Sequence, residues 1–225
     1  MSTLYARDMP PTRASYHHGA LRDALLSASL QLIETEGIGA VSLRRVAREA
    51  GVSPAAPYYH FTDRAALLGA LSAKGFRLLA AELAAATASA GSPVQALAAL
   101  IRAYVTFAHQ QPAYFQLMFR PELSQHHKNP EAKAAEDAAS ACLEQAVADC
   151  VSADVIPAAQ ADALAVTAWG LGHGLASLWL DGQLKDLYQD PAALMAQITA
   201  LLESILPADA ARDPAAKSRE PKKRA

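Results

Sequence analysis

Apolar residues recur at intervals of three and four residues through most of the 225-residue chain, which is the spacing that places them on one face of an α-helix. Alanine is very frequent, whereas β-branched and aromatic residues are sparse, and this composition favours helices over strands. We therefore predict an all-α fold of about nine helices. They cover residues 18–37, 42–50, 53–60, 63–88, 93–111, 112–119, 130–151, 157–181 and 191–206.

The segment from Ser42 to Arg64 is expected to hold two short helices around a tight turn. Ser42 can cap the first helix, because its hydroxyl can accept a hydrogen bond from a backbone N–H that has no partner inside the helix. Gly51 stands where a helix C-terminus favours a left-handed residue, and Ser53 followed by Pro54 is a typical helix start. This arrangement is typical of a helix-turn-helix, whose second helix enters the major groove of DNA.

The second helix of this motif is predicted to be short and to present small and aromatic side chains. Pro57 has no N–H to donate to the carbonyl four residues earlier, so it removes one helical hydrogen bond. Ala55, Ala56 and Tyr59 are expected to face outward, where alanine permits close approach to the groove and contact with thymine methyl groups. Because no arginine on this helix could read guanine, specificity is expected to depend on van der Waals contact, Tyr59, nearby arginines and DNA shape.

Arg44 and Arg45 lie in the first turn of the leading helix. Two cations at the positive end of a helix are locally unfavourable, and a nearby polyanion would reverse the sign of that interaction. This placement indicates that DNA phosphate binds there. The alternative is a solvated cluster of charges.

The same segment has a specific residue pattern: Ser, then Leu-Arg, an apolar pair, Ala-Gly-Val-Ser, then Tyr-any-His-Phe and a basic residue. The matching residues are Ser42, Leu43, Arg44, Val46, Ala47, Ala50, Gly51, Val52, Ser53, Tyr58, His60, Phe61 and Arg64. In these residues the chain resembles the TetR/AcrR family of bacterial transcriptional repressors. Farther along, Trp169 and the pair His173-Gly174 resemble a C-terminal domain type of this family that is marked by Trp, His and Gly (WHG).

The resemblance implies a three-helix helix-turn-helix head followed by a larger C-terminal domain that binds ligand and dimerises. We place a flexible arm at residues 1–17, the DNA-binding domain at 18–64, the ligand-binding and dimerisation domain at 65–206, and a disordered basic tail at 207–225. In the family the last two helices pair with their copies in a four-helix bundle. We therefore expect a homodimer on a palindromic double-stranded DNA operator, released by a small-molecule effector.

The family's docking geometry also assigns DNA contacts to residues of this sequence. They are Arg22, Ser42, Arg44, Arg45, Ser53, Pro54, Ala55, Ala56, Tyr58, Tyr59, His60 and Arg64. Arg22 and Arg64 are expected to meet phosphates. For Arg22 the alternative is that it only solvates its helix.

Aromatic residues cluster between residues 104 and 119, and such a cluster can line a pocket for an apolar or aromatic effector. His173 is the one titrating polar group in an apolar helix and lies four residues from Trp169, on the same surface. The candidate ligand-binding residues are Tyr104, Phe107, Tyr114, Phe115, Met118, Trp169 and His173. The alternatives are ordinary core packing for the aromatic cluster and a hydrogen-bonded core position for His173.

The net charge of −2 is unevenly distributed: residues 1–64 carry +1, residues 65–210 carry −7 and residues 211–225 carry +4. An acidic body beside a mildly basic head suits a duplex binder, because repulsion away from the binding face aids orientation. No apolar run is expected to reach the roughly 18 residues that span a bilayer, and the N-terminus lacks the apolar core of a signal peptide. We therefore expect a cytoplasmic protein without a membrane partner.

Enzyme motifs such as GxSxG, a Walker loop, HExxH and the Rossmann glycines do not occur in the sequence, so we expect no enzymatic activity and no cofactor. His126 and His127 could bind a metal, but adjacent side chains point apart, and a solvated loop is favoured. Cys142 and Cys150 are more typical of small buried side chains than of a redox pair. Two alternatives stay open: a metal- or redox-sensing repressor of the same fold, and a helical small-molecule-binding module without DNA activity.

Overall fold

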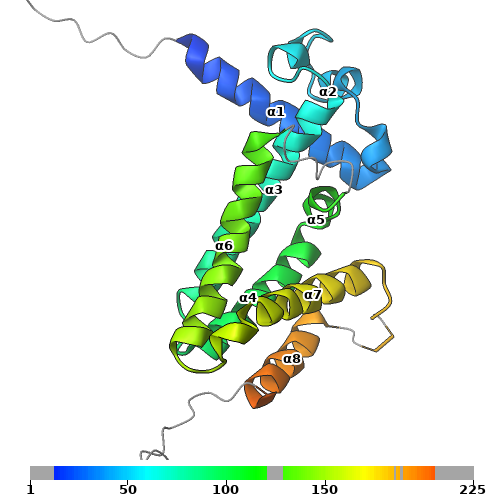
Figure 1. Ribbon diagram of the computed structural model, residues 1–225. Coiled ribbons are helices and arrows are strands. Elements are labelled where there is room, and N and C mark those ends of the chain that lie inside the picture. The colour runs from blue at the N-terminus through cyan, green and yellow to red at the C-terminus, as the bar shows by residue number, and fades with distance from the viewer. Residues whose placement is uncertain (1–12, 121–128, 185, 188–189, 206–225) are drawn as a thin grey trace, which may run out of the picture. The chain divides into compact units, whose positions relative to one another are not determined.

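The computed structural model describes residues 13–120, 129–184, 186–187 and 190–205, and within these ranges every regular element is a helix (Figure 1). The eight α-helices are α1 Arg13–Glu36, α2 Leu43–Glu49, α3 Arg64–Thr87, α4 Pro93–Gln110, α5 Pro112–Met118, α6 Pro130–Ser152, α7 Ala161–Leu180 and α8 Pro191–Ile205. Short 3₁₀ helices lie at η1 Ile38–Ala40, η2 Ala56–Tyr59 and η4 Ala158–Gln160. The predicted all-α fold is confirmed, with eight α-helices in place of about nine because the predicted helix 53–60 is the 3₁₀ segment η2.

Helix boundaries agree with the predicted ones within a few residues, except at the start of α1. This helix begins at Arg13, five residues before the predicted start at His18, so residues 13–17 are helical rather than part of a flexible arm. The sequence between these positions contains no proline or glycine that would stop a helix. Residues 1–12 of the predicted arm and the predicted tail 207–225 lie outside the described residues.

The chain divides into two compact units. Among the described residues, the first unit contains 13–76, 111–120 and 129–136, and the second contains 77–110 and 137–205 with the gaps given above. Helices α3 and α6 each begin in the first unit and end in the second. The predicted domain boundaries at residues 64 and 206 therefore stay predictions.

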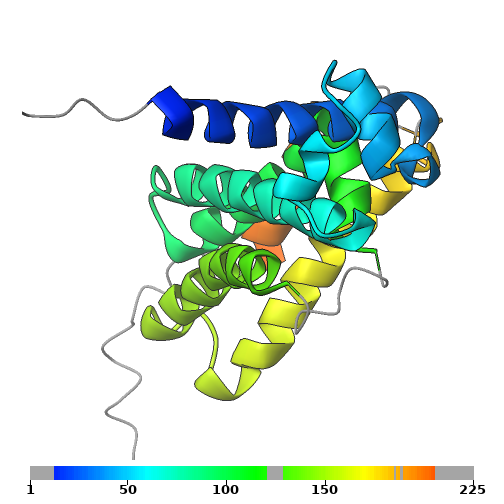
Figure 2. The same ribbon diagram turned by 90° about the horizontal axis from the view of Figure 1, so that it is seen from above.

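The first unit holds the predicted DNA-binding segment. Helix α1 packs against η1, α2 and α5, and α2 packs against η2; Figure 2 shows α2 and η2 beside the C-terminal half of α1. The buried side chains of this unit include Leu25, Leu26, Leu32, Val41, Val46, Phe61, Leu67 and Leu71. Each fully buried Leu or Val contributes about 1.5–3 kcal/mol relative to an exposed one, so this core holds α2 and η2 firmly against α1.

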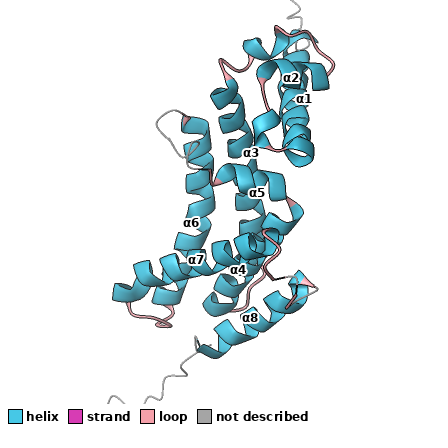
Figure 3. Cartoon of the chain, turned by 90° about the vertical axis from the view of Figure 1, so that its right-hand side faces the viewer, coloured by secondary structure: helices cyan, strands magenta, loops and turns pink. Residues whose placement is uncertain are grey.

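The second unit is organised around α4, which packs against α7 and α8 (Figure 3). The apolar stripe of α4 faces the core, and its residues Leu97, Leu100, Ile101, Tyr104, Val105 and Ala108 are all buried. On α8 the apolar residues are only partly covered by the described chain. Leu194 is buried, whereas Leu201 is 57% exposed. The described chain therefore leaves part of the apolar face of α8 uncovered.

Helix α7 belongs to a longer apolar segment than we expected from the sequence. Together with η4 it forms a 23-residue segment, Ala158–Leu180, in which an 18-residue window has a mean hydropathy of 1.3. The segment is long and apolar enough to cross a membrane by length and composition. The expectation that no apolar run reaches this length was wrong, because serine, threonine, histidine and glycine interrupt the segment but Asp162 is its one Asp, Glu, Lys or Arg side chain. A single helix of this kind is weak evidence for a membrane, since core helices of soluble proteins pass the same test.

Candidate nucleic-acid interface

Helix α2 and the turn after it have the predicted helix-turn-helix geometry. The Ser42 hydroxyl accepts a hydrogen bond from the backbone N–H of Arg45 at 3.3 Å, so the predicted N-cap is confirmed. Gly51 has a φ of +68°, the left-handed conformation that glycine adopts without steric cost. The N–H of Val52 donates to the carbonyl of Ala47 at 2.9 Å, which closes the end of the helix. The turn thus fixes the direction in which the chain leaves α2.

The segment after the turn is short because of Pro57. The carbonyl of Ser53 accepts its hydrogen bond from Ala56 at 3.0 Å, three residues on, since Pro57 has no N–H to donate. Further i to i+3 bonds give the 3₁₀ helix η2 in place of a regular recognition helix. Ala55 is the N-cap of η2, so the predicted helix start at Ser53 and Pro54 was wrong.

The surface of η2 presents two aromatic side chains to solvent. Tyr59 is 80% exposed and Tyr58 is 53% exposed, and the predicted contact residues Ser53, Pro54 and Ala55 are exposed as well. His60 is half-buried. Ala56 is buried, so the expectation that it faces outward was wrong, because the tighter three-residue period of η2 turns it toward the core beside Pro57.

The arginines at the start of α2 differ in their partners. Arg44 is exposed and forms no ion pair with any described residue. Arg45 is half-buried, and its guanidinium pairs with the carboxylate of Glu36 at the end of α1. Of the two arginines at the start of α2, Arg44 is therefore the one whose charge is not paired with a carboxylate of the described chain.

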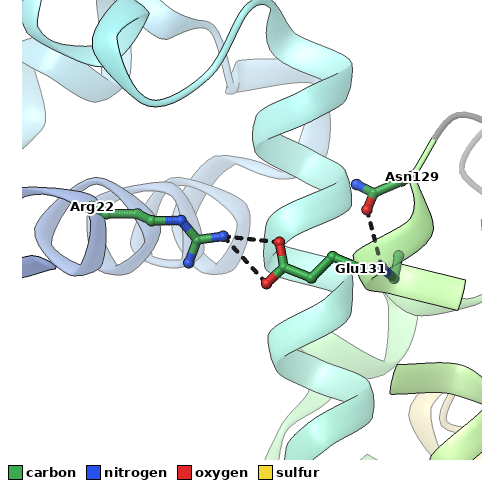
Figure 4. Close-up of polar contacts among 4 residues, drawn as sticks. Arg22, Asn129 and Glu131 are labelled. Carbon is green, nitrogen blue, oxygen red and sulfur yellow. Dashed lines mark hydrogen bonds and ion pairs between the residues drawn. The ribbon is translucent and has the colours of Figure 1, made fainter. Parts of the chain in front are cut away.

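Arg22 on α1 is held by a carboxylate from a distant part of the sequence. One guanidinium nitrogen donates to both oxygens of Glu131, in the first turn of α6, at 3.1 and 3.3 Å (Figure 4). The guanidinium carbon also lies 5.8 Å from the centroid of the Phe61 ring, within range for a cation–π contact. The alternative that Arg22 only solvates its helix is thus replaced by two specific contacts.

Arg64, at the start of α3, ties this helix to the segment before α2. Its Nε donates to the carbonyl of Val41 and its terminal nitrogen to the carbonyl of Ile38, both at 2.8 Å. The cap of α3 is the carboxylate of Asp63, which accepts from the N–H of Ala66 at 2.8 Å. Arg64 therefore has a structural role, whether or not it also meets a phosphate.

The candidate ligand residues fall into both units. Tyr114, Phe115 and Met118 belong to the first, where Tyr114 and Met118 pack close to Gly75 and Phe115 contacts Phe119. Burial raises the pKa of the Tyr114 hydroxyl, and the negative charge of Glu34 adds to the effect. All three ligand candidates in this unit are buried.

The other candidates, Tyr104, Phe107, Trp169 and His173, lie in the second unit. The Tyr104 hydroxyl and Nδ1 of His173 are 2.9 Å apart, and the rings of Trp169 and His173 are in tilted contact with centroids 6.1 Å apart. Burial raises the pKa of the Tyr104 hydroxyl, and a hydrogen bond with the Trp169 side chain partly opposes this. His173 is thus both hydrogen-bonded and close to an exposed aromatic ring, so both alternatives stated for it stay open.

Burial also lowers the pKa of His173, and this predicts a pH dependence of stability. The unfolded chain then binds more protons than the folded one below the ordinary histidine pKa, so stability falls as the pH drops through that range and levels off once the folded-state group is also protonated. The slope is at most about 1.4 kcal/mol per pH unit, and less because the ring is partly solvated. Urea denaturation of the parent and of His173→Asn between neutral and mildly acidic pH measures it. Equal slopes for the two proteins would contradict the prediction.

A separate groove of about 470 Å³ lies in the second unit between α3, α4 and α6. Its lining comprises Ala84, Thr87, Ala88, Ala96, Ala141, Cys142, Gln145, Ala146 and Asp149. None of the predicted ligand residues lines it, so the prediction of an aromatic pocket stays untested. Burial raises the pKa of both thiols, Cys142 and Cys150, which reduces the thiolate fraction that redox chemistry needs.

Metal ligands do not gather in the part of the chain that the structure describes. Within it, no group of three or more His, Cys, Asp or Glu side chains could hold a metal ion. His126 and His127 lie outside the described residues.

A helix-turn-helix with exposed tyrosines and an exposed arginine beside it is the arrangement found in proteins that bind duplex DNA. Comparison with known families agrees with this class. Residues 25–71 match the model described as "Bacterial regulatory proteins, tetR family", and residues 97–202 match "Tetracyclin repressor-like, C-terminal domain". The chain belongs to the TetR family of bacterial transcriptional regulators, and these relationships point to a regulator rather than an enzyme.

Individual relatives cover the chain to different extents. The HTH-type transcriptional regulator BetI of Rhizobium meliloti (strain 1021) is 37% identical over 81 residues, which are 36% of this chain and 40% of the relative's length. A structure of a protein of unknown function from Rhodococcus sp. RHA1 is 33% identical, with a TM-score of 0.72 over 85% of this chain and 97% of that one. A tetR-family regulatory protein from Rhodococcus RHA1 is 21% identical, with a TM-score of 0.67 over 83% of this chain and 96% of that one, and it shows the shared fold.

Proposed function

We propose that this regulator is a homodimeric repressor that binds a palindromic operator and is released by a small-molecule effector. The observation that carries the proposal is the exposure of Tyr58 and Tyr59 directly after the turn at Gly51. Large aromatic side chains left in solvent have little packing value within their own chain, and aromatic rings and hydroxyls suit contacts with base edges and backbone. Arg44 would supply a phosphate contact beside them. A regulator of this kind acts in the cytoplasm, where its operator is.

The homodimer is supported by the exposed face of α7. Val166, Gly170, Gly174 and Leu178 follow one another at four-residue spacing, which makes a ridge along the helix. Val166 is 65% and Leu178 44% exposed, and a Cβ added at either glycine would meet no atom within 4 Å. Only 22% of the apolar window of this helix is buried within the chain. A second copy packed on this ridge, with the partly uncovered face of α8, would remove the apolar surface from water.

The effector is proposed to bind in the C-terminal domain, with Tyr104, Phe107, Trp169 and His173 among its contacts. The hydrogen-bonded Tyr104–His173 pair next to an exposed indole supports this, because it offers a polar group inside an otherwise apolar helix pair. For Tyr114, Phe115 and Met118, which belong to the first unit, the predicted ligand contact stays a prediction. We also propose that the domain is of the WHG type, on the strength of Trp169, His173 and Gly174. The effector must favour one state over the other by about 1–3 kcal/mol to change DNA binding usefully.

Selection of bound duplexes from a random pool tests this function. The proposal predicts enrichment of an inverted repeat whose half-sites are about 10–10.5 base pairs apart or a multiple of it, as two copies of a helix-turn-helix require. A shift assay with the selected duplex then gives the stoichiometry. Enrichment of no sequence, or of a single half-site bound by one protomer, would contradict it.

A further inference from the structure

The ion pair between Arg22 and Glu131 joins helix α1 to the start of helix α6, which lies outside the helix-turn-helix. The two residues are 109 positions apart in the sequence, yet both belong to the first unit. The cation–π contact between the Arg22 guanidinium and the Phe61 ring places the ion pair beside the end of the helix-turn-helix, because Phe61 follows η2 by two residues. Phe61 is only 3% exposed. The charge of Arg22 therefore lies at the edge of the proposed DNA-binding surface, where a phosphate is its natural partner.

Glu131 is held in place by the start of α6. The side-chain oxygen of Asn129 accepts from the N–H of Ala132 at 3.0 Å and so caps the helix (Figure 4). The Asn129 amide lies directly against Gly69 of α3, where a Cβ would come within 1.9 Å of its nitrogen. Glu131, in the first turn, is also stabilised by the positive end of the helix. Its carboxylate is thus positioned to meet Arg22 and remains stabilised when Arg22 leaves.

A carboxylate and a phosphate offer a guanidinium the same chemistry, since both present two anionic oxygens for its N–H groups. The side chains of Arg22 and Glu131 are 33% and 44% exposed, so solvent and DNA can reach the pair. An ion pair this exposed contributes little to the stability of the fold. A phosphate can therefore displace Glu131 from Arg22. Losing the ion pair cancels part of the binding free energy gained from the new phosphate contact, and it leaves the Glu131 carboxylate beside the phosphate.

From this geometry we propose that Glu131 is an internal competitor of DNA phosphate for Arg22, and that it lowers the affinity of the head for duplex DNA. The inference rests on the proposed DNA-binding function. It makes Glu131 a determinant of DNA affinity although it lies in α6, far along the chain from the helix-turn-helix.

The test is the affinity of the full-length protein for a duplex of mixed sequence, measured by fluorescence anisotropy at several salt concentrations. Glu131→Gln frees one cation in each protomer. The logarithm of the affinity should then fall more steeply with the logarithm of salt, by about 1.8 for two added phosphate contacts, and the affinity should rise by up to about 30-fold at about 0.15 M salt. In an Arg22→Gln background, Glu131→Gln should have almost no effect. Glu34→Gln removes an equal charge from an exposed residue of α1 that forms no ion pair with the described residues, and it should change the affinity far less.

Each other outcome has a definite meaning. An unchanged or weaker affinity for a folded Glu131→Gln protein would overturn the inference and make the pair a structural brace. An equal gain in the Arg22→Gln background would overturn it too, because the effect would then come from net charge. If Glu131→Gln does not fold, Glu131→Asp keeps the charge but shortens the reach, and it should raise the affinity in the same direction. Failure of the parent protein to bind any duplex would instead refute the proposed function.

Discussion

Replacing Arg44 by alanine should weaken operator binding about 30-fold at about 0.15 M salt, while the protein stays folded and dimeric. Two phosphate contacts, one in each protomer, would be lost, and each accounts for a slope of about 0.9 in the dependence of log affinity on log salt. The fold should survive because Arg44 is exposed and forms no ion pair among the described residues. Anisotropy titrations at several salt concentrations measure both the affinity and the slope.

Arg102→Ala is the matched control, since it removes the same charge from an exposed position on α4 in the second unit. It should leave the salt slope almost unchanged. Tyr59→Ala tests a residue that is proposed to contact bases. Its affinity for the operator should fall with little change in the salt slope. The ratio of its affinities for the operator and for a mixed-sequence duplex should also fall. An Arg44→Ala protein that binds the operator as the parent does would remove Arg44 from the proposed phosphate contacts.

The elements that the sequence predicted well are those that depend on neighbouring residues. Ser42 caps α2 and Gly51 takes the left-handed conformation because both roles are set within one helical turn. The shortness of η2 follows in the same way from the missing N–H of Pro57. Most helix boundaries were found for the same reason, since periodicity, caps and breakers act locally.

The side-chain partners of the interface could not be predicted in this way. Arg22 was assigned to a phosphate or to solvent, and its partner Glu131 lies 109 residues away, in a helix start that gives no sign of the pairing. Arg64 fills two donor positions with backbone carbonyls, which carry no sequence signal at all. The Asn129-Pro130 pair was an available signal for the start of α6, because asparagine before proline is a typical helix cap. It gave no information about which residues contact the first turn of α6.

Ala56 shows a second limit. A regular recognition helix would turn it outward with Ala55, but the 3₁₀ period of η2 rotates it into the core. Pro57 signalled a short helix without fixing which side chains face solvent. The surface available to bases is therefore narrower and more aromatic than the sequence suggested, which increases the expected importance of Tyr58 and Tyr59.

Replacing Gly170 by leucine should convert the proposed dimer to monomer and thereby weaken operator binding. A Cβ at this position meets no atom of the same chain within 4 Å, and leucine is favoured over glycine inside a helix by about 1 kcal/mol, so the protomer should fold at least as well. At a two-fold interface the added side chain is present twice, and overpacking costs about 1–3 kcal/mol each time. The dimer dissociation constant should therefore rise by about 30-fold or more, which sedimentation velocity over a range of protein concentrations measures.

Gly172→Leu is the informative comparison, because it makes the same change two residues away on the opposite side of α7. A Cβ at Gly172 already lies 3.5 Å from the ring of Tyr104, so leucine there should disturb the packing of α4 on α7 and lower the unfolding temperature. The two variants thus distinguish the face of α7 that packs within the protomer from the face that is proposed to contact a second copy. A Gly170→Leu protein that dimerises as tightly as the parent would place the interface away from the ridge of Val166, Gly170, Gly174 and Leu178. The apolar surface of α7 would then need another partner.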